Sequence, residues 1–199
     1  YSSAASDVYK RQHEDHIGGM DDVITAYSSE VDCIMLSKEE GTTATYRSVV
    51  KAADSSSAER LTPKAGATYT LGDATWQILS CDTDVSDLNE SSIVIKLTYG
   101  NTSFLFTGDA TMNTEQGLEM SGYDLKSDVL KVGHHGSASS TADSFLDAVA
   151  PEIAVISVDS ESDMGEMYHH PATSTLQRLS QHGIKVYRTD ELGTIRITS

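Results

Sequence analysis

Hydrophobic positions recur along the chain with two different periods, which predicts a mixture of helices and strands. Met20, Val23, Ile24 and Tyr27 lie three or four positions apart and would form one face of a short helix. Further helices are predicted over residues 46–53, 110–120, 142–149 and 171–181. Strands are predicted over residues 31–36, 68–71, 75–79, 92–98, 103–106, 128–132, 153–158, 184–188 and 193–198. The early strands follow one another through short turns and the later ones alternate with helices, so the pattern favours an α/β (α+β) fold with a mixed sheet layered by helices.

The length of the chain and its apolar runs limit the architecture further. The 199 residues suffice for one domain with a sizeable core. The longest uninterrupted apolar runs, such as residues 153–156, contain about four residues, whereas a membrane-spanning helix needs about 20. We therefore expect no membrane contact by this segment.

Residues 1–12 differ from the rest of the chain. The stretch YSSAASDVYKRQ has no helical period, no strand alternation and no signal-peptide core, and it leads directly into a segment dense in motifs. We expect residues 1–12 to be a non-native or unstructured segment and residues 13–199 to form the folded domain. On this interpretation the native chain begins earlier, and any targeting signal lies outside this sequence.

Six of the seven histidines fall into three short groups, each at a point where regular structure passes into a loop or a helix. The groups are HEDH at 13–16, GHHGS at 133–137 and YHHP at 168–171, and the sequence TGD follows a predicted strand at 107–109. A single pair such as His169 and His170 would be interpreted as surface histidines, and we interpret the isolated His182 in that way. The four groups together favour one site, because α/β sheets gather ligands at the ends of their strands.

The side chains in these groups are of the types that bind divalent metal ions. Imidazole and carboxylate together suit zinc, iron or manganese. Two carboxylates with four or more imidazoles exceed what one tetrahedral ion needs. The set therefore matches a site for two ions that share a bridging carboxylate and a bridging water.

In their order along the chain, these motifs resemble the metallo-β-lactamase fold superfamily. The resemblance rests on HEDHIGG at 13–19, TGD at 107–109, KVGHHGS at 131–137 and YHHP at 168–171. Within the superfamily, the chain is similar to the hydrolase domain of the bacterial ComEC-type competence protein and its free-standing relatives. The resemblance implies an αββα sandwich. It also implies a β-hairpin layer before the first motif, so we expect N-terminal strands to be missing from this fragment.

The first family motif, H-x-H-x-D-H, is matched in part. The resemblance makes His13 its second histidine, Asp15 its aspartate and His16 its last histidine, while Arg11 occupies the position of the first histidine. A guanidinium cannot bind a cation. We therefore expect the chain as given to bind one ion tightly and to be a weak hydrolase.

The resemblance assigns the remaining ligands of two divalent ions, zinc or manganese. Asp109 would bridge both ions, and His170 would complete the second site beside Asp15 and His16. One of the pair His134 and His135, by analogy His134, would complete the first site beside His13. His135 is expected to be a catalytic residue that either supports the metal ligands from behind or faces the substrate. The expected substrate-binding residues are Ser137 and Asn89.

The resemblance also implies a mechanism and a substrate class. Two ions would hold a bridging hydroxide in line with the scissile centre, and Asp15 would orient the water and accept its proton. The likeness favours a phosphodiesterase or nuclease-type activity in DNA uptake, at the extracellular face or in a secreted protein. The net charge of −16 counts against a long nucleic-acid footprint, so such a substrate would need a partner domain or would be short.

Two alternatives are left open by the sequence. The chain could hydrolyse C–N or thioester bonds, as other members of the same superfamily do. It could also be a non-catalytic binding module with a degraded metal site, an alternative that rests on Arg11.

Overall fold

The computed structural model describes residues 14–37, 41, 43–82, 87–159 and 169–198. The chain divides into two compact units, Tyr1–Pro63 (unit 1) and Lys64–Ser199 (unit 2). Each unit has a hydrophobic cluster of its own. The two units are therefore described separately.

Unit 1 combines short helices with a pair of parallel strands. Its described elements are α2 (Glu14–Ile17), α3 (Met20–Ala26), β1 (Cys33–Met35), α4 (Ala44–Ser55) and β2 (Glu59–Leu61). Thr43 is the N-cap of α4, and its hydroxyl accepts a hydrogen bond from the Tyr46 amide at 3.0 Å. Val49 and Ala53 lie four positions apart on one face of α4 and pack with Ile24 and Ile34. These side chains form the small core of unit 1.

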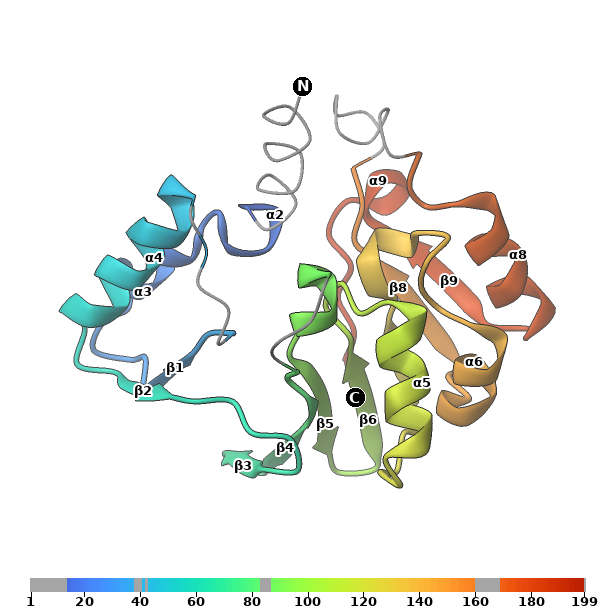
Figure 1. Cartoon of the computed structure of the whole chain (residues 1–199), viewed down its shortest axis with the longest axis horizontal. Coiled ribbons are helices and arrows are strands. Elements are labelled where there is room, and N and C mark those ends of the chain that lie inside the picture. Colours follow the sequence, from blue (N-terminus) through green and yellow to red (C-terminus); the bar gives the residue numbers. More distant parts are fainter. Residues whose placement is uncertain (1–13, 38–40, 42, 83–86, 160–168, 199) are drawn as a thin grey trace. The chain divides into compact units, whose positions relative to one another are not determined.

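Unit 2 is built on a seven-stranded mixed sheet (Figure 1). Its strands, in both chain and sheet order, are β3 (Thr68–Leu71), β4 (Ala74–Ser80), β5 (Val94–Tyr99), β6 (Thr102–Phe106), β7 (Val129–Lys131), β8 (Ile153–Ile156) and β9 (Lys185–Arg188). The first four strands pair antiparallel through hairpins, and β6 to β9 pair parallel. Since parallel strands need crossover connections, helices separate these later strands.

The helices of unit 2 supply the apolar side chains that cover one face of the sheet. They are α5 (Met112–Met120), α6 (Asp143–Val149) and α8 (Thr173–Gln181), with short helical turns at η1 (Leu88–Ser91), η2 (Gly133–Gly136) and α9 (Thr189–Leu192). Leu105, Leu130 and Ala154 are register partners on β6, β7 and β8, and all three are fully buried. Phe145 of α6 and Leu179 of α8 belong to the same core. The mixed sheet and its helical layer agree with the α/β fold predicted from the sequence.

Most of the predicted elements are present with boundaries within two residues. The strand predicted at 193–198 is wrong, because these residues pair with no strand among those described and follow the helical turn α9. Arg188 and Asp190, two residues apart, form an ion pair at the start of that turn, so the chain bends away after β9. The sequence prediction also missed β2, whose three residues contain a single apolar side chain. Among the described helices, none has the length and apolarity needed to cross a membrane.

Candidate metal centre

The first histidine motif lies in unit 1. Asp15 and His16 belong to the short helix α2, and both are exposed, with 3.9 Å between His16 Nε2 and Asp15 Oδ1. His13 and Arg11 lie outside the described residues. The roles of these residues therefore stay predictions.

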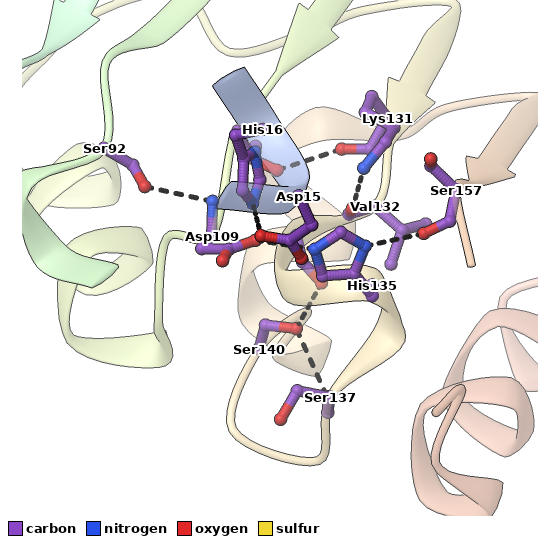
Figure 2. Close-up of polar contacts among 12 residues, drawn as sticks. Asp15, His16, Ser92, Asp109, Lys131, Val132, His135, Ser137, Ser140 and Ser157 are labelled. Carbon is purple, nitrogen blue, oxygen red and sulfur yellow. Dashed lines mark hydrogen bonds and ion pairs between the residues drawn. The ribbon is translucent and has the colours of Figure 1, made fainter. Parts of the chain in front are cut away.

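The TGD motif forms a tight turn at the end of β6. The Ala110 amide donates to the Thr107 carbonyl, and the Asp109 amide donates to the Ser92 hydroxyl at 3.0 Å (Figure 2). Gly108 has a φ of 55°, and a Cβ at this position would lie 2.9 Å from Ser92 Oγ, so glycine is required here. The turn buries Asp109 to 3% exposure. A carboxylate buried to this extent needs a cation or hydrogen-bond donors next to it.

The GHHGS motif follows the neighbouring strand β7 and is tied to the TGD turn. The His134 amide donates to the Gly108 carbonyl at 3.0 Å, and the Thr107 hydroxyl donates to the Lys131 carbonyl at 2.9 Å. His134 and His135 both adopt left-handed conformations, with φ values of 47° and 53°. These contacts bring the TGD and GHHGS motifs together at one end of the parallel strands.

His135 faces Asp109 directly. Its Nε2 lies 3.4 Å from Asp109 Oδ1, and its Nδ1 lies 2.7 Å from the Ser157 carbonyl oxygen (Figure 2). A carbonyl oxygen only accepts hydrogen bonds, so Nδ1 carries a proton and donates it to Ser157. In the neutral ring, Nε2 then carries the lone pair, which is the form of imidazole that binds a metal ion. The Ser157 carbonyl thus fixes the orientation of the His135 ring.

His170 joins the group from the loop after β8. The rings of His134 and His170 lie edge to face, with 5.6 Å between their centroids. The Ala172 amide donates to the Gly136 carbonyl at 2.8 Å, which fixes this loop to the GHHGS motif. Unit 2 therefore gathers three imidazoles and one carboxylate from loops that are distant in the sequence.

The electrostatic environment keeps His170 neutral. Its pKa is lowered to about 4, mainly by burial and then by the imidazoles of His134 and His135, whereas the carboxylate of Asp109 acts in the opposite direction. At neutral pH the ring is therefore uncharged, with one of its two nitrogens unprotonated. A neutral imidazole near a buried carboxylate fits a divalent cation such as zinc or manganese.

The two predicted substrate-binding residues have different surroundings. Asn89 lies in η1, is 5% exposed, and its Oδ1 forms no hydrogen bond with any described residue. Ser137 Oγ lies 3.0 Å from the Ser139 hydroxyl and also accepts from the Ser139 amide, so its hydroxyl takes part in the structure of the loop. Substrate contact by either residue stays a prediction.

Ser92 and Ser157 contribute to the group and were not singled out from the sequence. Ser92 acts through its hydroxyl and Ser157 through its main-chain carbonyl. Ser92 lies 17 positions before Asp109, and Ser157 lies 22 positions after His135. Because no local pattern marks contacts over such distances, only the fold reveals them.

Comparisons with known proteins agree with this arrangement. The family model for the metallo-beta-lactamase superfamily matches residues 12–160. The chain is 38% identical over 134 residues to ComE operon protein 3 of Bacillus subtilis. The aligned region covers 67% of this chain and 17% of that protein. It is 40% identical over 111 residues to competence protein ComA of Neisseria gonorrhoeae. This second aligned region covers 55% of this chain and 16% of that protein. The chain thus spans less than a fifth of the length of these two relatives.

A solved structure shows the same fold. CmlA, a diiron beta-hydroxylase from Streptomyces venezuelae, superposes with a TM-score of 0.50 at 15% identity, over 81% of this chain and 39% of that one. At this identity the likeness concerns the fold alone. The predicted fold class and superfamily are confirmed. With a matching family model over most of its length and competence proteins among its relatives, this chain belongs to the metallo-beta-lactamase superfamily and is related to the ComEC-type competence proteins.

Proposed function

We propose that residues 13–199 form a metal-dependent hydrolase domain that cleaves phosphodiester bonds with two divalent ions, zinc or manganese. The observation that carries the proposal is the group in unit 2. There, Asp109 lies 3.4 Å from His135, and the ring of His134 packs against that of His170. A carboxylate with three imidazoles at one end of a sheet is a donor set suited to these metals.

The ligand assignment follows the sequence motifs. One ion would be held by His13 and His134, the other by Asp15, His16 and His170, with Asp109 shared by both. The contacts within unit 2 support the roles of Asp109, His134 and His170, and the HEDH motif supports those of the other residues. Arg11 replaces a histidine of that motif, so we expect less than full occupancy of the first site.

We propose roles for the protein groups around the ions. Bound divalent ions lower the pKa of water and stabilise negative charge that develops on a phosphate. His135, held at Nδ1 by Ser157, presents Nε2 toward Asp109 and is proposed to face the substrate. Asp15 is proposed to orient the attacking water and to accept its proton. Asn89 and Ser137 are proposed to contact the substrate.

The names of the relatives favour a nucleic-acid phosphodiester as the substrate class. ComE operon protein 3 and competence protein ComA are proteins of genetic competence by name. The net charge of −16 argues that a nucleic acid would be held over a short length or presented by a partner domain. We further propose action at the extracellular face, where DNA uptake begins.

The test is hydrolysis of bis-p-nitrophenyl phosphate by the full chain with added Zn²⁺ or Mn²⁺. Asp109→Asn removes the shared ligand charge, and Asp124→Asn is the matched control because Asp124 is exposed and paired with Lys96. We expect metal-dependent hydrolysis that chelators abolish, retained in Asp124→Asn and lowered more than about 100-fold in Asp109→Asn, a larger loss than outer-shell changes cause.

Other results would redirect the proposal. Metal-dependent cleavage of a thioester or a lactam without cleavage of the phosphodiester would overturn the substrate class and keep the hydrolase. Metal content after dialysis, measured by mass spectrometry, that is equal in Asp109→Asn and the parent chain would overturn the ligand role of Asp109. A parent chain that binds no metal would support a non-catalytic module.

A further inference from the structure

The loop that carries His134 and His135 has an unfavourable backbone conformation at three positions. His134, His135 and Thr141 all have left-handed backbones, with φ values of 47°, 53° and 64°, although none of them is glycine. A left-handed backbone is unfavourable for a residue that carries a Cβ. A conformation of this kind persists only where surrounding groups determine it. The residues that impose this shape must therefore be sought outside the loop.

Glu115 of α5 holds the end of the loop from one side. It is 1% exposed, and its two carboxylate oxygens accept hydrogen bonds from the amides of Thr141 at 2.5 Å and Ala142 at 2.9 Å. Ala142 is the N-cap of α6 and offers no side-chain cap of its own. Glu115 thus supplies, from another helix, the acceptor for the N-cap amide that the N3 side chain of a capping box ordinarily provides.

Arg178 of α8 holds the same residues from the other side. Its Nε donates to the Thr141 carbonyl at 2.7 Å, and its Nη2 donates to the Ser140 carbonyl at 2.9 Å. Nη2 also donates to the hydroxyl of Thr175, which in turn donates to the Ser137 carbonyl. Hydrogen bonds from a planar guanidinium are strong and directional. The amide of Thr141 is therefore held by the buried carboxyl group of Glu115, and its carbonyl is held by the half-buried guanidinium of Arg178.

This arrangement reaches the histidines through Ser140. The Ser140 side chain is fully buried, and its hydroxyl lies 2.8 Å from the Gly133 carbonyl and 3.2 Å from the Ser137 carbonyl. Gly133 immediately precedes His134, and the Ser137 amide donates to the His134 carbonyl at 2.8 Å. Displacing residues 140–142 would therefore release both ends of the two-histidine turn.

We propose that Glu115 and Arg178 form a clamp and act as positioning residues for the metal centre. The inference rests on the proposed function, because it assigns the two residues to metal binding and not to folding alone. The clamp holds His134 and His135 in their left-handed conformations, so that their imidazoles are directed correctly before an ion arrives. Neither clamp residue is among the proposed metal ligands.

The test measures binding of Co²⁺ alone to the full chain at pH 7.5, by competition with a chelator and by the visible absorption spectrum of the bound ion. In Glu115→Gln the side-chain carbonyl oxygen can still accept a hydrogen bond from one backbone amide. The side-chain NH2 group, however, would face the other backbone amide, and both of these groups are donors. We expect Co²⁺ to bind about 10–100-fold more weakly, as for outer-shell changes at other metal sites, with an altered spectrum. Far-UV circular dichroism confirms that each variant is folded.

Two further variants separate positioning from charge and from folding. Glu119→Gln makes the same change one turn later on α5, where Glu119 accepts from the exposed Ser144 hydroxyl, and it should bind Co²⁺ as the parent does. Arg178→Lys keeps the charge but cannot reproduce the planar fork, so it should also weaken binding. If Glu115→Gln does not fold, Arg178→Lys serves as the test of the clamp.

The outcomes distinguish the two proposals. Parent-like affinity and spectrum in folded Glu115→Gln or Arg178→Lys would overturn the clamp and leave the proposed metal centre intact. If the parent and Glu119→Gln bind no Co²⁺, the proposed function is overturned and the clamp with it.

Discussion

His134 and His135 are adjacent in the sequence, yet their imidazoles face different partners. The ring of His134 packs against His170, while His135 is held between Asp109 and Ser157. The two residues are therefore not interchangeable. A role as metal ligand for His134 and a catalytic role for His135 predict different consequences of losing each side chain.

We predict that His134→Ala lowers both bound metal and hydrolysis, whereas His135→Ala lowers hydrolysis more than metal. Metal per chain is measured by mass spectrometry after dialysis, beside the rate on bis-p-nitrophenyl phosphate. His182→Ala is the control, because His182 contacts Asp143 and Asp147 of α6 and lies outside the group. The reverse pattern would exchange the two assignments.

Glu115 should make the stability of the protein depend on pH. Burial raises its pKa from 4.5 to about 7, although the amides of Ala142 and Thr141 and the charge of Arg178 oppose this shift and Glu119 adds to it. Between pH 4.5 and 7 the folded chain therefore retains a proton that the unfolded chain releases. The free energy of unfolding must fall as the pH rises through this window.

We predict that Glu115 removes up to about 3 kcal/mol of stability between pH 4.5 and 7.5. Glu115→Gln cannot titrate and should lack this decline, so the stability of the parent relative to the variant should be greatest at pH 4.5. Urea denaturation followed by the fluorescence of Trp76, the single tryptophan, reports on unit 2. A difference between the two chains that does not vary with pH would contradict the prediction.

Among the secondary-structure elements, the turn η2 depends on close approach between two loops. Gly136 at its end has a φ of 81°, and a Cβ there would lie 2.7 Å from Pro171 Cβ. Gly183, after α8, has a φ of 69° but no atom within 4 Å of the same position. The two glycines thus share a backbone conformation and differ in the space around them.

We predict that Gly183→Ala costs about 1–2 kcal/mol, the penalty of the left-handed conformation alone. Gly136→Ala should cost a further 1–3 kcal/mol or so, because Pro171 must move to admit the methyl group. Urea midpoints from Trp76 fluorescence measure both losses. Equal losses of stability in the two variants would contradict this, because they would mean that Pro171 moves aside with no loss of free energy.

The described part of the chain contains two cores of unequal size. The cluster of unit 1 has four buried side chains on α3, β1 and α4, whereas that of unit 2 joins strands β4 to β8 with α5, α6 and α8. Because local stability follows the apolar surface that each region buries, unit 1 should open more readily.

We predict that amides of α4 exchange with deuterium at least about tenfold faster than those of β5 and β6, which corresponds to a difference of about 1.4 kcal/mol in opening free energy. Hydrogen-exchange mass spectrometry on the intact chain resolves these segments. Equal protection in the two units would show that they unfold as one.

The sequence by itself determined the order of elements and the residue types that are proposed for the site. Periodicity placed α4, α6 and the hairpin of β3 and β4 within two residues, because these elements depend on neighbours close in the chain. Asp109, His134 and His170 were singled out because each belongs to a short motif beside a predicted strand or helix. The strand predicted at 193–198 was wrong, because a strand depends on pairing with a distant segment.

Only the tertiary structure decided how the motifs are oriented. The contact of Asp109 with His135, the support from Ser92 and Ser157, and the clamp of Glu115 and Arg178 all join residues at least 17 positions apart. No local pattern encodes such contacts, because strand order and loop packing bring their partners together. The left-handed backbone of His134 and His135 is the clearest case, since the conformational preference of each residue opposes it and the packed fold imposes it.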